Sequence, residues 1–223
     1  MNETDGRRLR GDKARTSILA QSIRLASTEG LEGVTIGRLA TAAGVGKANI
    51  TVLFGNKEEL QLATLERAAE AYESAVVSPS QCHSTPLEKL KALVEGWFHF
   101  IENKTLPGGC FMSAIASEYR ARPGRIQDWI NEYRAGTRSL FRRLIVEAKD
   151  AGELLATVDE DQLAFELFAA QGFANAAELL GNHNEFERSR DGSLRAINSA
   201  MTAKAKRQAS RKAQNPSSKD ALV

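Results

Sequence analysis

The chain has 223 residues, of which 42% are hydrophobic and 26% are charged, and its formal net charge is +2. These proportions are ordinary for a globular protein, and two cysteines exclude a disulfide framework or a zinc site made of four cysteines. The chain contains neither an apolar run of about 18 residues nor a hydrophobic export segment near its start, so we expect no membrane association and a cytoplasmic location.

The charges are unevenly distributed along the chain. Residues 1–57 contain nine Lys or Arg and five Asp or Glu, a net +4, and residues 203–223 contain six and one, a net +5. Residues 58–202 therefore carry −7. A basic head on an acidic body indicates that the head meets a polyanion, although scattered solvated charges would give the same distribution.

The first predicted elements are an arm and a helix. Residues 1–11 have three arginines and no apolar periodicity, which predicts a flexible basic arm that either follows DNA or is simply a disordered terminus. Asp12 is the expected cap of a helix that Gly30 ends. Lys13 and Arg15 lie on its first turn, as phosphate contacts or as solvated charges.

Residues 35–54 predict two short helices around a turn, which is the pattern of a helix-turn-helix. Gly44 permits the left-handed backbone of the turn, and Val45 can fill the corner between the helices. The residues of the inner face are Ile36, Leu39, Ala40, Ala43, Ile50 and Phe54.

The second of these helices is expected to enter the major groove of DNA. Gly46 and Ala48 are small enough for close approach, and Asn49 can pair with adenine, unless it is only a solvated helix residue. Thr51 and Val52 can meet thymine methyl groups.

Two helix starts add candidate phosphate contacts. Thr35 can cap its helix, which is its simplest role, and Arg38 lies one turn further along the same backbone. Asn56 is the expected cap of the next helix, with Glu59 at the capping-box position. Lys57 opposes the dipole of that helix, which favours an external anion. The DNA-binding candidates are thus Thr35, Arg38, Gly46, Lys47, Ala48, Asn49, Thr51, Val52 and Lys57.

The stretch ARTSILAQSIRLASTEGLEGVTI, the turn at residues 43–47 and the segment LFGNKEEL at residues 53–60 resemble the DNA-binding domain of the TetR family of transcriptional regulators. The resemblance covers about the first quarter of the chain. It implies that Thr35 and Lys57 face phosphate. The family usually has an aromatic residue, commonly Tyr, where this sequence has Thr51, which gives Asn49 and Lys47 more weight in sequence reading.

The rest of the chain is also predicted to be helical. Apolar periodicity and caps predict helices at 57–77, 86–104, 109–121, 125–150, 160–180 and 185–203, with a break at 78–84. Asp159 is the expected cap of the fifth of these helices, and Asn184 that of the last. We therefore predict an all-α fold of about nine helices, with a three-helix helix-turn-helix domain at 12–57 and a helical-bundle effector and dimerisation domain at 58–202. Residues 203–223 are expected to form a basic, disordered tail.

The helix at 160–180 is apolar on two sides, so it should be covered on both faces. Small residues at 172 and 176 would allow close helix crossing. We infer a symmetric homodimer through this helix and the last one, which the family resemblance also implies.

A small-molecule effector would bind among the helices of the body, where apolar walls and a few polar groups come together. Gln171 and Asn175 stand out as amides on an apolar helix, and they either face a ligand or pair across the dimer. The candidate residues, each of which could instead be plain core, are Trp97, Phe98, Phe100, Cys110, Phe111, Met112, Trp129, Tyr133, Gln171, Phe173 and Asn175.

We interpret the chain as a ligand-responsive transcriptional regulator, a repressor that binds a palindromic double-stranded DNA operator as a dimer and that an unknown small molecule releases. The main alternative is a regulator switched by the Cys110 thiol without an organic effector. An interaction module that no longer binds DNA, and an enzyme using Cys110 or Glu118, are further rivals. Since no catalytic set, phosphate loop or metal-ligand cluster stands out, we expect no enzyme activity, cofactor or metal.

Overall fold

The computed structural model describes residues 3–214, with side chains for residues 11–211. The described residues form helices and no strand, which confirms the all-α prediction. The helices are α1 (Glu3–Glu29), α2 (Ile36–Ala43), α3 (Lys47–Phe54), α4 (Lys57–Tyr72), the π-helical turn η1 (Glu73–Val77), α5 (Ser78–Gln81), α6 (Pro86–Glu102), α7 (Phe111–Glu118), α8 (Arg125–Asp150), α9 (Glu160–Leu179), α10 (His183–Ala200) and α11 (Ala203–Gln214).

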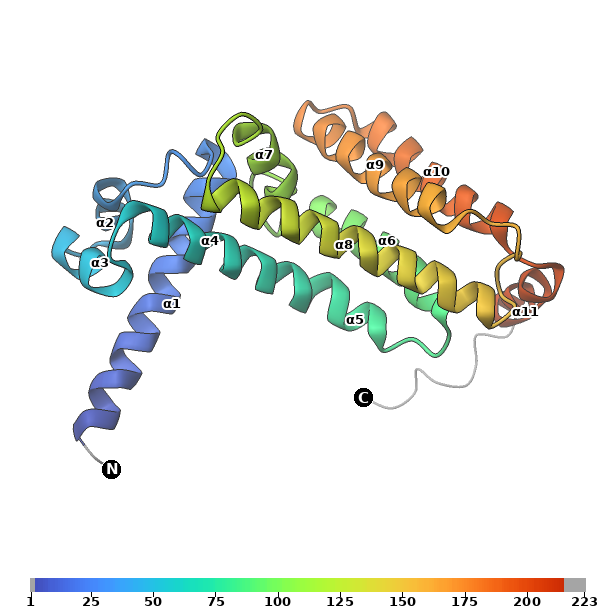
Figure 1. Cartoon of the computed structure of the whole chain (residues 1–223), viewed down its shortest axis with the longest axis horizontal. Coiled ribbons are helices and arrows are strands. Elements are labelled where there is room, and N and C mark those ends of the chain that lie inside the picture. The colour runs from blue at the N-terminus through green and yellow to red at the C-terminus, as the bar shows by residue number, and fades with distance from the viewer. Residues whose placement is uncertain (1–2, 215–223) are drawn as a thin grey trace.

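The helices form a small head and an elongated body (Figure 1). Helices α1, α2 and α3 make the head, and α4 leads from it along the body beside α8. Helix α6 packs against α8, α9 and α10 inside the body, and α9 and α10 form a pair on one side of it. None of the helices within residues 3–214 is long and apolar enough to cross a membrane.

Local capping explains most of the helix starts. The side-chain oxygens of Thr35, Asn56 and Thr85 each accept a hydrogen bond from the backbone N–H three residues on, at 3.0–3.3 Å. Asp159 accepts from the N–H groups two and three residues on. Gly44 has φ 65° and closes α2 with the predicted left-handed turn. These contacts join near neighbours, so the sequence was sufficient to predict them.

Helix α1 begins earlier than predicted. It runs from Glu3 through Asp12 without interruption, so the expected flexible arm is helical from residue 3 onward, and only residues 1 and 2 lie outside the described part. The stretch contains Arg, Leu and Glu, which favour helix, and no proline. The glycines at 6 and 11 are insufficient to stop a helix that is already propagating.

Three other boundaries also differ from the prediction. The break expected at 78–84 is helical as far as Gln81, because η1 and α5 continue α4. When α4, η1 and α5 are counted as one continuous helix, the described chain has ten helices rather than about nine. Helix α10 starts at His183, ahead of the expected cap Asn184. The tail forms α11, in which Ala205 is buried and Thr202 accepts from its N–H; residues 215–223 lie outside the described part.

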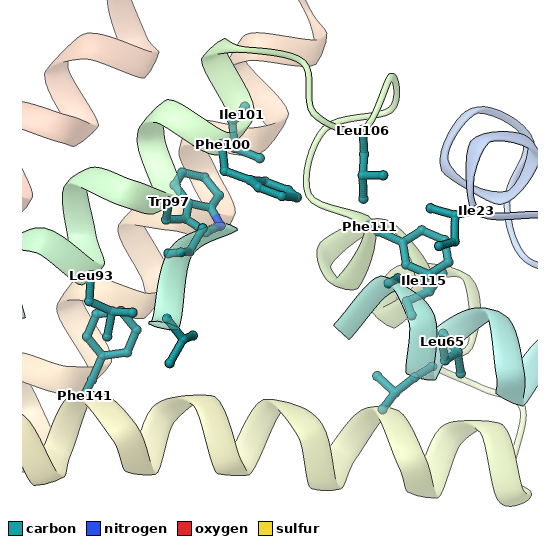
Figure 2. Close-up of a cluster of buried hydrophobic side chains, with 14 of the residues drawn as sticks. Ile23, Leu65, Leu93, Trp97, Phe100, Ile101, Leu106, Phe111, Ile115 and Phe141 are labelled. Atoms are coloured by element: carbon teal, nitrogen blue, oxygen red, sulfur yellow. The ribbon is translucent and has the colours of Figure 1, made fainter. Parts of the chain in front are cut away.

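The hydrophobic core is continuous from the head into the body. Figure 2 shows Phe111 and Ile115 of α7 beside Ile23 of α1 and Leu65 of α4. Further along the same core, α6 and α8 supply Leu93, Trp97, Phe100, Ile101 and Phe141. Because α7 packs between the two parts, its position affects both of them.

Candidate functional site

The first candidate surface is the outer face of α3. Ile50 and Phe54 are buried beneath it, and 85% of the Val52 side chain is exposed. The other outward residues are Gly46, Lys47, Ala48, Asn49 and Thr51, all exposed as predicted. An exposed apolar side chain among small and polar ones suits a groove that presents both hydrogen-bonding groups and methyl groups.

The start of α2 has the predicted cap, but Arg38 already has interaction partners within the protein. Thr35 Oγ1 accepts from the N–H of Arg38 at 3.2 Å, so capping is its role within the protein. The Arg38 guanidinium is paired with Glu29 and donates to the carbonyl of Gly33 at 3.4 Å. A phosphate contact by Arg38 would therefore compete with Glu29.

Arg15 contacts protein. Its guanidinium donates to the carbonyl of Leu53 at 3.0 Å and lies 4.6 Å from the centre of the Phe54 ring. It thus holds the end of α3 against α1. From the sequence we expected phosphate or solvent as the partner of Arg15, because no neighbouring residue indicates a contact with a carbonyl 38 residues away.

Lys57 lies in an ion-pair cluster centred on Glu32. Lys57 Nζ is 2.7 Å from Glu32 Oε2, and the Tyr119 hydroxyl donates to Glu32 Oε1 at 2.6 Å. Arg122 is 3.6 Å from the same carboxylate. The hydrogen bonds from Lys57 and Tyr119 lower the pKa of Glu32 from 4.5 to about 2. Sequence reasoning missed Glu32, whose body partners Tyr119 and Arg122 lie almost 90 residues away.

The Glu32 cluster predicts a pH dependence of stability. The pKa of Glu32 is lower in the folded protein, so its contribution is present above pH 4.5 and is lost as the pH falls towards 2. The side chain is 39% exposed, so screening reduces the effect. We expect Glu32→Gln to flatten the dependence of the urea midpoint on pH in this window. An unchanged slope would contradict the assignment.

A second carboxylate joins α7 to the head. The two oxygens of Glu118 accept hydrogen bonds from the backbone N–H groups of Leu31 and Glu32, each at 2.8 Å. Gly30 lies against this carboxylate, so that a Cβ there would come within 2.9 Å of it. We call these two hydrogen bonds the Glu118 clamp. At the start of α8, Arg125 pairs with Glu58 at 3.2 Å and with Glu59 at 2.5 Å.

The body contains a cavity of about 80 Å³ between α4, α6, α7, α8 and α9. Seven predicted pocket residues line it: Trp97, Phe100, Cys110, Phe111, Met112, Tyr133 and Gln171. Sequence reasoning missed eight others: Ala68, Tyr72, Leu106, Ser113, Arg134, Thr137, Phe168 and Gly172. Most of them occupy helix positions that the sequence pattern does not distinguish from ordinary core or surface positions.

Four predicted pocket residues do not line this cavity, although Asn175 lines the groove that adjoins it. Phe98 is fully buried and packs edge-on against Trp97 and Phe186. Trp129 stacks on Tyr133 at 5.2 Å outside the cavity. Phe173 is 57% exposed on the outer face of α9. Asn175 Oδ1 accepts from the N–H of Cys110 at 2.6 Å, so this amide positions the start of α7. Side-chain type indicated hydrophobicity and polarity but could not show on which side of a helix the cavity lies.

Two buried polar atoms of the cavity lining have no hydrogen-bond partner within the described structure: Gln171 Nε2 and the Tyr72 hydroxyl. Gln171 is only 4% exposed. Burial raises the pKa of Tyr72 and also that of Tyr133, so both phenols remain protonated. A buried polar atom without a partner is costly, which makes these groups the natural anchors for a ligand.

The cavity adjoins a larger groove of about 630 Å³ between α7, α8 and α9. Ser113, Arg134 and Gly172 line both spaces. The groove provides room that the cavity lacks. Within the described residues, no cluster of His, Cys, Asp or Glu suited to a metal ion is present.

The head and the body each match a model of the same protein family. The model for bacterial regulatory proteins of the tetR family matches residues 18–64, and the model for the tetracyclin repressor-like C-terminal domain matches residues 86–193. The first covers the helix-turn-helix, and the second covers α6 to α9 and part of α10.

Individual proteins that resemble this chain are also described as transcriptional regulators. The HTH-type transcriptional activator FasR of Mycolicibacterium smegmatis is 31% identical over 98 residues, which are 44% of this chain and 45% of FasR, so the match spans less than half of that relative. A TetR transcriptional regulator from Chloroflexus aurantiacus is similar in structure, with a TM-score of 0.79 and 24% identity over 86% of this chain and 98% of its own. AibR, solved with isovaleryl coenzyme A and operator DNA, has a TM-score of 0.61 and 21% identity over 73% of this chain and 86% of its own. At these identities the structural likeness concerns the fold alone. Since the two family models together account for both the head and most of the body, the chain belongs to the TetR family of transcriptional regulators.

Proposed function

We propose that the protein is a ligand-responsive repressor that binds a palindromic operator as a homodimer and leaves it when a small molecule occupies the body. The observation that carries this proposal is the position of α7. Its first turn lines the cavity through Phe111 and Met112, while its last residue, Glu118, holds the head. One short helix thus contacts both the effector space and the DNA-binding domain.

The DNA-binding role is supported by the face of α3. Asn49 is exposed and can read a base edge, and Lys47 is exposed beside it at the start of the helix. Lys57 is a proposed phosphate contact. On binding DNA it would give up its ion pair with Glu32 for a phosphate group. The test of operator binding is a gel shift on the DNA upstream of the protein's own gene, since regulators of this kind can act on their own promoters.

Asn49→Ala and Lys57→Ala should affect DNA binding in different ways. We expect Asn49→Ala to relax the preference for operator over unrelated duplex, because a bidentate base contact contributes about 1–3 kcal/mol of discrimination. Lys57→Ala should weaken binding to all duplexes and reduce the slope of log affinity against log salt by about one, because Lys57 is the proposed phosphate contact. Fluorescence anisotropy at several salt concentrations measures both. An equal loss of affinity on every sequence for Asn49→Ala would reject its base-reading role.

The dimer is supported by the outward face of α9. Phe165 and Phe173 are 58% and 57% exposed, and Leu180, just after the helix, is 76% exposed. The small residues Gly172 and Ala176 are exposed between them. Large apolar side chains separated by small ones suit close packing against a symmetry-related copy. Such a dimer would set the separation of two α3 helices, which must match about 34 Å or a multiple of it.

Release requires that the ligand favour a conformation with weaker DNA binding. A hundredfold change in operator affinity needs about 3 kcal/mol of differential binding. Helix α7 is a more direct route to the head than a shift of α4 alone, because the Glu118 clamp acts on the turn that precedes α2.

The structure does not favour the thiol switch. Cys110 caps α7 and is half-buried in the cavity lining, where its N–H is held by Asn175. Cys82, the other cysteine, is exposed at the end of α5. A test compares operator release by oxidant in the wild type and in Cys110→Ser; equal release in both would exclude Cys110 as the switch.

A further inference from the structure

The residues around the cavity and the groove supply hydrogen-bond donors but no carboxylate. No Asp or Glu occurs among the described residues that line either space, although Asp and Glu are common on the body as a whole. Tyr72 and Tyr133 stay protonated, and Gln171 Nε2 can only donate. The two spaces therefore suit a ligand that brings acceptor oxygens.

Arg134 adds a positive charge where the two spaces meet. It lines both the cavity and the groove, and its guanidinium carbon lies 5.0 Å from the centre of the Phe168 ring, which also lines the cavity. The side chain is half-buried, and no carboxylate pairs with it within the described structure. A half-buried arginine stacked on an aromatic ring and lacking an anionic partner is well placed to bind an anion in a fixed orientation.

The sizes of the spaces limit the ligand. The cavity of about 80 Å³ is walled mainly by aromatic and aliphatic side chains, whereas the groove of about 630 Å³ is more polar and also contains Arg120. The cavity is therefore the smaller and the more apolar of the two spaces, which suits it to a short apolar part of a ligand rather than to its polar end.

We propose that the effector is a small organic acid. Its short apolar body occupies the cavity, its oxygens accept hydrogen bonds from the unpaired Gln171 and Tyr72 donors, and its negative charge lies against Arg134. A carboxylate has about four lone-pair sites, enough for an arginine and a further donor. This inference rests on the proposed function of the cavity and specifies the chemical class of its ligand.

The test uses three unbranched probes with six carbons each and different head groups: hexanoate, hexan-1-ol and hexylamine. Isothermal titration calorimetry on the full-length protein compares their affinities for the wild type, Arg134→Gln and Arg138→Gln. Arg138 lies one turn along α8, is exposed and lines neither space, so it is the matched control. Circular dichroism checks that each variant remains folded.

We expect hexanoate to bind and the neutral and cationic probes to bind at least about tenfold more weakly. Arg134→Gln should weaken hexanoate by about tenfold to a hundredfold, the usual range for a hydrogen bond to a charged group, and should leave hexan-1-ol unchanged. Arg138→Gln should change neither. Arg134→Lys should restore part of the affinity for hexanoate, because it keeps the charge but loses the planar fork.

Three results would overturn the proposal. If hexan-1-ol or hexylamine binds as tightly as hexanoate, or if both arginine variants behave alike, the cavity still binds a ligand but not as an acid site. If hexanoate fails to bind at millimolar concentration, the ligand class is wrong. The proposed regulatory function is judged separately by the upstream-DNA gel shift, which requires no effector.

Discussion

Replacing Phe173 with glutamate is expected to convert the proposed dimer into monomers and to abolish the proposed operator binding. Phe173 is 57% exposed in the single chain and lies on the same outward face of α9 as Phe165. A central aromatic residue of an interface typically contributes about 2–4 kcal/mol, and a two-fold axis places the substitution twice in each dimer. The combined loss of at least about 4 kcal/mol corresponds to about a thousandfold increase in the dimer dissociation constant.

Sedimentation velocity measures the change in mass, and a gel shift measures the loss of operator binding. Leu155→Glu is the matched control, because Leu155 is also an exposed apolar residue, 43% exposed, but lies in the connection between α8 and α9. The control should remain a dimer. A Phe173→Glu protein that still sediments as a dimer would place the interface on another face.

Replacing Glu118 with alanine is expected to uncouple the proposed effector site from the head. The carboxylate accepts two backbone hydrogen bonds at 2.8 Å, and each hydrogen bond to a charged group contributes about 1.5–3 kcal/mol before solvent screening. Without it, the N–H groups of Leu31 and Glu32 lose their partner on α7. In the proposed mechanism, a movement of α7 on ligand binding then no longer reaches the turn before α2.

Effector binding and DNA binding should therefore become independent in the Glu118→Ala protein. Calorimetry should show an effector affinity close to that of the wild type, while operator affinity should respond to the effector by less than about a tenth of the wild-type factor. Glu132→Ala, a change of an exposed glutamate on α8, is the control and should leave the coupling intact. Full release of DNA by effector in Glu118→Ala would show that α4 alone transmits the signal.

The head illustrates how far a sequence can be interpreted. The inner residues Leu39, Ala40 and Ile50 are buried as the periodicity predicted, and Gly44 adopts the expected left-handed conformation. The interactions of the charged residues were less predictable. Lys57 is bound to Glu32, and Arg15 is bound to the carbonyl of Leu53. Both partners are distant in sequence. Helical periodicity identifies which face a charge occupies, but not which partner another helix brings to it.

The pocket shows the same limit in the body. Cys110, Phe111 and Met112 were among the candidates because they lie among the apolar and polar residues of the body helices, and they do line the cavity. Tyr72 was overlooked because it lies at the end of a long regular helix, directly before the π-helical turn η1. Phe173 was assigned to the pocket because α9 is apolar on two sides, and nothing local distinguishes the side facing the cavity from the side facing outward.

The sequence by itself determined the helices, most of their caps and the helix-turn-helix, because these depend on periodicity and on hydrogen bonds between residues three or four positions apart. Only the tertiary structure decided which side chains meet. Glu118 contacts residues almost 90 positions away, and the lining of the cavity comes from five helices. Such contacts depend on how the whole core packs, since the rotation of each helix is set jointly by all the surfaces that it buries.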